Sequence, residues 1–97
     1  MRIVWTRLAA ADLAAALAAI EAEHPIAADD LRDQISRRLK ILRKQPRSGR
    51  MVPERAQEGL REIVLAPCRL VYEVAGPELF VLRFWHSRRD LTRSSLR

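Results

Sequence analysis

The chain has 97 residues, enough for one modest hydrophobic core, so we expect a single domain over residues 1–97. Its 18 lysines and arginines exceed its 12 aspartates and glutamates, and the net charge of +6 favours an anionic partner: nucleic acid, an acidic protein or an anionic membrane surface. The one cysteine excludes an internal disulfide, and the two histidines and this cysteine lack metal-ligand spacing, so we expect no metal and no cofactor.

The positive charge is concentrated in the middle of the chain. Residues 1–31 carry two basic and five acidic side chains, residues 32–55 carry nine and two, and residues 56–97 carry seven and five. Two interpretations remain open for the basic middle: a solvated helix face followed by a basic loop, or a docking surface that begins on a helix and continues into that loop. The longest uncharged run near the N-terminus, Leu13 to Ile20, is too short to cross a membrane, which predicts a soluble cytoplasmic protein with no membrane partner.

The first predicted elements are a strand and a helix. Arg2–Trp5 has the composition of a short strand, and Thr6 can cap a helix that runs from Arg7 to about Glu23. The apolar stripe of this helix has helical spacing and consists of Leu13, Ala16, Leu17 and Ile20. Pro25 is expected to end the helix, because the residue before a proline avoids the α conformation.

A second helix is expected to start at a cap formed by Asp29 or Asp30 and to run to about Lys44. Its apolar stripe consists of Leu31, Ile35, Leu39 and Leu42. The two helices should form an antiparallel hairpin that packs on a sheet. Residues 45–59, with two prolines and two glycines, predict a long loop that is either functional or a simple crossover.

Three strands, at about 60–66, 68–75 and 78–86, predict an antiparallel meander, with the N-terminal strand joining one side of the sheet. The fold class is therefore α+β. Because strand residues alternate between faces, we expect the apolar set that includes Phe80, Leu82 and Phe84 to lie under the helices. The opposite face should carry Glu62, Arg69, Glu73, Arg83 and Trp85. Either it is a solvated face with cross-strand ion pairs, or its arginines bind an anion.

Short motifs follow one another along this series of elements. They are Trp5-Thr6, Ala11-Asp12-Leu13, Pro46, Ser48-Gly49-Arg50, Val52-Pro53-Glu54, Arg61-Glu62-Ile63-Val64, Arg69-Leu70-Val71-Tyr72 and His86-Ser87-Arg88-Arg89-Asp90-Leu91. Their order resembles the RelE/ParE superfamily of toxins from bacterial type II toxin–antitoxin modules, over nearly the whole chain. The resemblance implies a small toxin that is held inactive, in a hetero-oligomer, by a cognate acidic antitoxin whose C-terminal segment wraps around it.

The superfamily has two activities, and RelE-like members cleave mRNA on the ribosome. A nuclease of that kind needs a base, an acid and a phosphate clamp, and the candidate set here is Glu62, Arg69, Arg83 and His86. The sequence departs from RelE itself in the first strand of the meander, where Glu62 and Val64 stand in place of two lysines. No tyrosine follows His86.

ParE-like members resemble the chain more closely, in the Val-Pro-Glu loop and in the His-x-Arg-Arg-Asp ending. This resemblance implies inhibition of DNA gyrase, with no catalytic residues of the toxin's own. The expected contact residues for the target or the antitoxin are Arg50, Arg61, Arg69, Arg83, Trp85, His86, Arg88 and Arg89. A ParE-like gyrase inhibitor is therefore the first hypothesis, a ribosome-dependent endoribonuclease the second, and a non-toxic basic domain that binds protein or nucleic acid the third.

Overall fold

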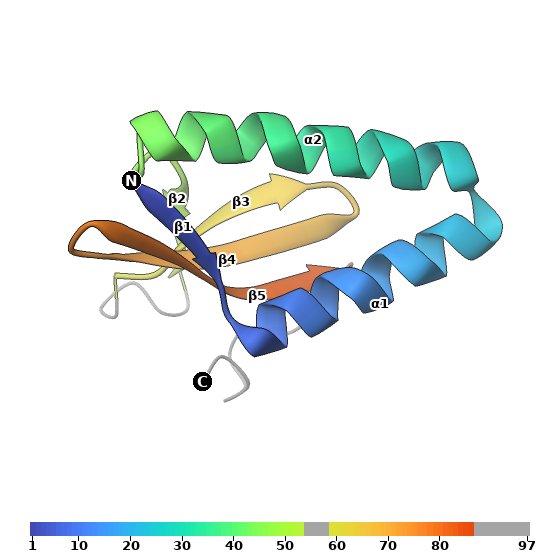
Figure 1. Ribbon diagram of the computed structural model, residues 1–97, viewed down its shortest axis with the longest axis horizontal. Helices are drawn as coiled ribbons and strands as arrows, with labels where there is room; N and C mark the ends of the chain where they lie inside the picture. Colours follow the sequence, from blue (N-terminus) through green and yellow to red (C-terminus); the bar gives the residue numbers. More distant parts are fainter. Residues whose placement is uncertain (54–58, 87–97) are drawn as a thin grey trace.

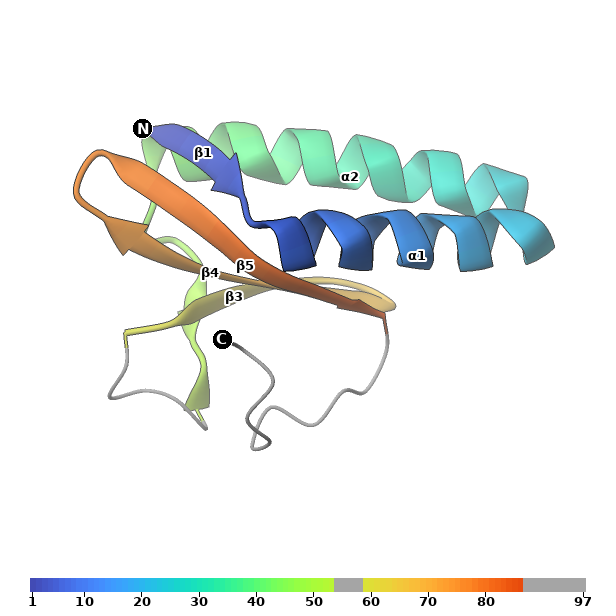
Figure 2. The same ribbon diagram turned by 60° about the horizontal axis from the view of Figure 1, so that its bottom comes forward.

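The computed structural model describes residues 1–53 and 59–86 of the chain. Within these residues, two helices cover one face of a five-stranded sheet (Figures 1 and 2). The elements are β1 (Arg2–Trp5), α1 (Arg7–Glu23), α2 (Pro25–Lys44), β2 (Arg50–Met51), β3 (Arg61–Leu65), β4 (Cys68–Ala75) and β5 (Glu78–His86). No helix in this described part of the chain is long and apolar enough to span a membrane.

The strands are arranged in the order β1-β5-β4-β3-β2. The last three strands form the predicted antiparallel meander, and β1 pairs in parallel with β5 at one edge of the sheet. The α+β fold predicted from the sequence is therefore confirmed, including the position of the first strand beside the meander. The two-residue strand β2, which pairs antiparallel with β3 at the other edge, was not predicted.

Thr6 joins the start of α1 to the sheet. Its hydroxyl oxygen accepts a hydrogen bond from the Ala9 amide at 3.1 Å, which confirms the predicted helix cap. The same hydroxyl donates to the Leu82 carbonyl at 3.1 Å, and the Thr6 amide donates to the Val81 carbonyl at 3.1 Å. The helix therefore begins at a fixed point beside β5, just beyond the segment of β5 that pairs with β1.

The predicted start of α2 is wrong. The helix begins at Pro25 rather than after Asp29 or Asp30, and His24 is its N-terminal flanking residue. Proline suits the first position of a helix, because its ring fixes a helical φ and the missing N–H is not needed there. Asp29 lies within the helix and forms an exposed ion pair with Arg32. A single residue, His24, thus separates the two helices of the antiparallel hairpin (Figure 1).

The main hydrophobic core lies between the helices and the sheet. Ala9 and Ala16 of α1 are buried, and their small side chains let the helix approach β5 closely. The other buried members of this core are Leu31, Ile35, Leu42, Ile63, Leu65, Cys68, Leu70, Tyr72, Leu79, Val81 and Phe84. A second, smaller cluster consists of Val52, Leu60, Val71, Leu82 and Trp85. Since Val71 alternates with Leu70 and Tyr72, this second cluster lies on the opposite face of the sheet.

A β-bulge in β5 changes the predicted faces of that strand. Val71 lies opposite Arg83 but Tyr72 lies opposite Val81, so Leu82 is an extra residue in β5. The prediction that Phe80, Leu82 and Phe84 share the face under the helices is therefore wrong. The side chains that pack toward the helices are Leu79, Val81 and Phe84, whereas Phe80, Leu82 and Trp85 pack in the second cluster.

The Tyr72 hydroxyl binds the start of the 45–59 segment to the sheet by hydrogen bonds. Its hydroxyl donates to the Pro46 carbonyl at 2.7 Å and accepts from the Gly49 amide at 2.9 Å. A Cβ atom on Gly49 would lie 2.6 Å from this hydroxyl, so the close approach requires glycine. Burial raises the pKa of Tyr72 above its ordinary value. This anchoring directs the chain into β2.

Cys68 is fully buried, and burial raises the pKa of its thiol to about 11. Since the thiolate is the reactive form and the ordinary pKa is 9.0, the thiolate fraction at pH 8 falls about 100-fold. We expect the folded protein to react with a disulfide reagent at pH 8 at least about 100-fold more slowly than the chain unfolded in urea. Stopped-flow absorbance measures the two reaction rates, and a small thiol measured with and without urea controls for the effect of urea. Equal rates for the folded and the unfolded protein would contradict the prediction.

Candidate functional site

Five of the predicted site residues gather on the sheet face opposite the helices and along the adjoining edge of β5. We call this group the sheet-face cluster; it consists of Arg50, Glu62, Arg69, Arg83 and Trp85. It comprises an ion-paired part on β2, β3 and β4 and an arginine–tryptophan part on β5. Arg69 and Trp85 are register partners across β4 and β5, which joins the two parts.

Glu62 is the centre of the ion-paired part. Its side chain is completely buried, and its two oxygens are bound by different arginines: Arg50 holds Oε2 and Arg69 holds Oε1. The Nε of Arg69 lies 3.1 Å from Oε1. The strand register explains why these three side chains meet. Arg50 lies directly opposite Glu62, and Arg69 lies on the diagonal across β3 and β4. The arginines offset the large cost of burying a carboxylate.

The arginine–tryptophan part is held by a residue of α1, Asp12. The Arg83 guanidinium donates to both Asp12 oxygens, from Nε at 2.7 Å and from a terminal nitrogen at 3.0 Å. Asp12 also accepts from the Phe84 backbone amide at 3.0 Å. The hydrogen bonds that the Arg83 guanidinium donates to Asp12 raise the pKa of Arg83 above its already high ordinary value. The guanidinium carbon lies 5.2 Å from the centroid of the Trp85 ring, within range of a cation–π interaction.

Asp12 is the residue of this candidate site that sequence reasoning missed. It interrupts the alanine-rich start of α1 and belongs to the Ala11-Asp12-Leu13 motif, and these were the only signals in the sequence. Its partner lies 71 positions away, so no local pattern could reveal the pairing. Because Asp12 accepts from Arg83 and from a backbone amide of β5, it fixes the position of one site residue and the edge of the strand together.

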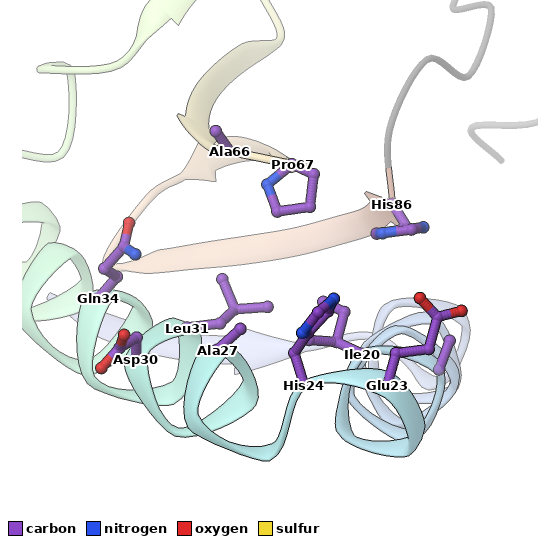
Figure 3. A pocket seen from close by; sticks show the side chains of 11 residues that line it. Ile20, Glu23, His24, Ala27, Asp30, Leu31, Gln34, Ala66, Pro67 and His86 are labelled. Atoms are coloured by element: carbon purple, nitrogen blue, oxygen red, sulfur yellow. The ribbon is translucent and has the colours of Figure 1, made fainter.

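The remaining predicted site residues lie elsewhere. Arg61 donates to the Gly49 carbonyl at 2.8 Å and so supports the loop before β2. His86 is exposed at the end of β5, where it lines a pocket of about 400 Å³ between the helix hairpin and the β3–β4 turn (Figure 3). It also borders a smaller pocket of about 220 Å³ that Asp12 helps to line. Arg88 and Arg89 lie outside the described residues.

The nuclease set is therefore brought together only in part. Glu62 contacts Arg69, whereas Arg83 is bound to Asp12. No hydrogen bond or ion pair within residues 1–53 and 59–86 joins His86 to any member of the set. In the same part of the chain no group of three histidine, cysteine, aspartate or glutamate side chains is placed to hold a metal ion.

Comparisons with known proteins identify the family. The family model described as "ParE toxin of type II toxin-antitoxin system, parDE" matches residues 3–91. This chain belongs to the ParE toxin family. It is similar to a solved structure titled "Chromosomal ParDE TA system from P. aeruginosa", with 29% sequence identity and a TM-score of 0.69, over 91% of this chain and 97% of that one. No curated protein matches the sequence.

Membership of the ParE family confirms the predicted resemblance, and it confirms the closer kinship to ParE-like than to RelE-like members. The chain is thus a toxin-family member of a type II toxin–antitoxin system, which implies an antitoxin partner. Like the family match, the similarity to this solved ParDE structure covers nearly the whole chain. The sheet-face cluster lies within residues 3–91, the part of the chain that the family model matches.

Proposed function

We propose that this ParE-family chain acts in the cytoplasm as an inhibitor of DNA gyrase, by protein–protein contact, and that a cognate acidic antitoxin neutralises it in a hetero-oligomer. The observation that carries the proposal is the state of Glu62: a fully buried carboxylate whose two oxygens are occupied by two guanidinium groups. The family assignment supports the toxin role, and the net charge of +6 suits an acidic antitoxin.

The contacts of the cluster favour binding over RNA cleavage. A general base must reach the 2′-hydroxyl proton within hydrogen-bonding distance, and a fully buried Glu62 held by Arg50 and Arg69 is not exposed to an RNA strand. Arg69 and Arg83, the expected phosphate clamp, are each already paired with a carboxylate of the protein. Their guanidinium groups are thus held in fixed positions, which suits shape-complementary contact with a protein surface.

Arg50 is the cluster member best placed to touch a partner, because 64% of its side chain is exposed. We expect the purified protein to inhibit gyrase supercoiling and the antitoxin encoded beside it to relieve that inhibition. Arg50→Gln should raise the concentration for half inhibition about tenfold, equivalent to ~1.4 kcal/mol of contact energy. The matched control is Arg7→Gln, an exposed residue at the start of α1. It should inhibit like the unmodified protein.

The alternatives have distinct outcomes. Cleavage of mRNA in programmed ribosomes, abolished by Arg69→Ala in a variant shown to be folded by circular dichroism, would establish the nuclease hypothesis and contradict the proposal. A soluble, folded protein that inhibits neither gyrase nor cell growth would support the third hypothesis, a basic domain without toxicity. Inhibition that Arg50→Gln and Arg7→Gln reduce equally would show that net charge, rather than the sheet-face cluster, determines binding.

A further inference from the structure

The C-terminal half of α2 and the turn after it carry a dense group of cations outside the sheet-face cluster. We call this group the α2 basic face; its members, all exposed, are Arg37, Lys40, Arg43, Lys44 and Arg47. Residues 34–53 contain no aspartate or glutamate. None of the five cations forms a hydrogen bond or ion pair with any residue in the described part of the chain. Their charges are therefore not neutralised by residues 1–53 and 59–86.

The spacing of these cations matches a line of phosphates. Arg37, Lys40 and Lys44 follow i, i+3 and i+7 spacing, so they lie on one side of α2. At 1.5 Å per residue, they span roughly 10 Å along the helix axis. One strand of duplex DNA carries a phosphate about every 3.4 Å along its axis, so this row can face about three successive phosphates.

The opposite end of the helix hairpin has the opposite charge. Its exposed acidic residues come from the end of α1 and the start of α2, at the tip where the two helices meet (Figure 1); they are Glu21, Glu23, Asp29, Asp30 and Asp33. Within residues 1–53 and 59–86, one cation at this tip, Arg32, forms ion pairs with two of these residues, Glu21 and Asp29. A polyanion is therefore attracted to one end of α2 and repelled from the other, which orients the protein during association.

The side chains of the α2 basic face fit nucleic acid better than a protein. Protein interfaces are centred on buried aromatic or apolar anchors and are depleted in lysine. Next to this face, Ile41 is an exposed large apolar side chain, and residues 34–53 contain no aromatic residue. Contacts with DNA phosphates need only cations, because the release of condensed counterions drives sequence-independent binding.

From these observations we infer that the α2 basic face binds the phosphate backbone of duplex DNA without sequence preference. The residues involved differ from those of the sheet-face cluster. The inference therefore stands independently of gyrase inhibition, and an assay without gyrase tests it.

The test is fluorescence anisotropy of the full-length protein with two labelled duplexes of unrelated sequence, at several salt concentrations between about 50 and 200 mM. Equal affinity for the two duplexes, with a linear fall of log K against log salt, is the expected result for phosphate contacts. The triple variant R37Q/K40Q/K44Q removes about three such contacts. The slope should therefore become shallower by about 2.7, and affinity at 100 mM salt should fall at least about tenfold.

A matched control removes the same three charges elsewhere. R2Q/R7Q/R32Q changes exposed arginines of β1, α1 and the acidic hairpin tip. Its slope of log K against log salt should differ from that of the unmodified protein by less than about 0.9, the contribution of one phosphate contact. Circular dichroism verifies that both variants are folded. Absence of binding at 50 mM salt, or equal losses in the two variants, would overturn the inference. Tighter binding of poly-glutamate than of DNA, lost in the α2 variant, would assign the face to an acidic protein instead.

Discussion

Replacement of Glu62 by glutamine is expected to lower the free energy of unfolding by about 3 kcal/mol or more. The substitution keeps the shape of the side chain but removes the negative charge that Arg50 and Arg69 share. Arg69, whose side chain is only 20% exposed, then retains a largely buried charge without its carboxylate. Breaking a buried pair costs roughly 3–5 kcal/mol, which for a domain of this size lowers the melting temperature by roughly 12 °C or more.

Urea unfolding followed by circular dichroism measures the effect of Glu62→Gln, and Glu78→Gln is its control. Glu78 makes the same kind of pair on β5, at 3.5 Å from Arg2, whose side chain is 77% exposed. The loss there should be below about 1 kcal/mol, since surface pairs contribute little. The double variant E62M/R69M should lose less than Glu62→Gln alone, because no buried charge is left unpaired. Similar losses in Glu62→Gln and Glu78→Gln would show that the buried pair is not a stabilising centre.

Sequence alternation was enough to predict one face of the sheet, because β3 and the first half of β4 pair without irregularity. Glu62, Arg69 and Trp85 therefore lie together, as the period of two requires. The same rule failed for Phe80 and Leu82, since the bulge in β5 reverses the faces within that strand. Residues far away in the chain bind the bulged segment: the Thr6 hydroxyl donates to the Leu82 carbonyl, and Asp12 accepts from the Phe84 amide.

Two other differences also have physical reasons. Pro25 predicts the end of α1, but proline can equally begin a helix, and the acidic residues that follow it are a misleading cap signal. The strand β2 has two residues, too few for a compositional pattern. It forms because distant groups hold it: Tyr72 anchors Gly49, and Glu62 binds Arg50. Contacts of this kind have no local signature, so the sequence could only predict a long loop.

Replacement of Asp12 by asparagine is expected to cost about 2–3 kcal/mol of unfolding free energy. Asp12 and Arg83 are 16% and 13% exposed, so their charge-assisted hydrogen bonds are largely shielded from water. An asparagine side chain has one acceptor oxygen for the donors of Arg83 and Phe84, and its own NH₂ group is a further donor among them. The control is Asp33→Asn on the exposed side of α2, which should change stability by less than about 0.5 kcal/mol.

A double-mutant cycle separates the Asp12–Arg83 pair from the Asp12–Phe84 contact. If the ion pair dominates, Asp12→Asn and Arg83→Gln should show a coupling energy of about 1–2 kcal/mol. Additive losses would mean that the bond to the Phe84 amide carries the effect. Gyrase inhibition, compared at a temperature where each variant is folded, adds a second measurement. If Asp12 positions Arg83 over Trp85, Asp12→Asn and Arg83→Gln should reduce gyrase inhibition by the same amount. Full inhibition by Asp12→Asn would limit the role of Asp12 to stability.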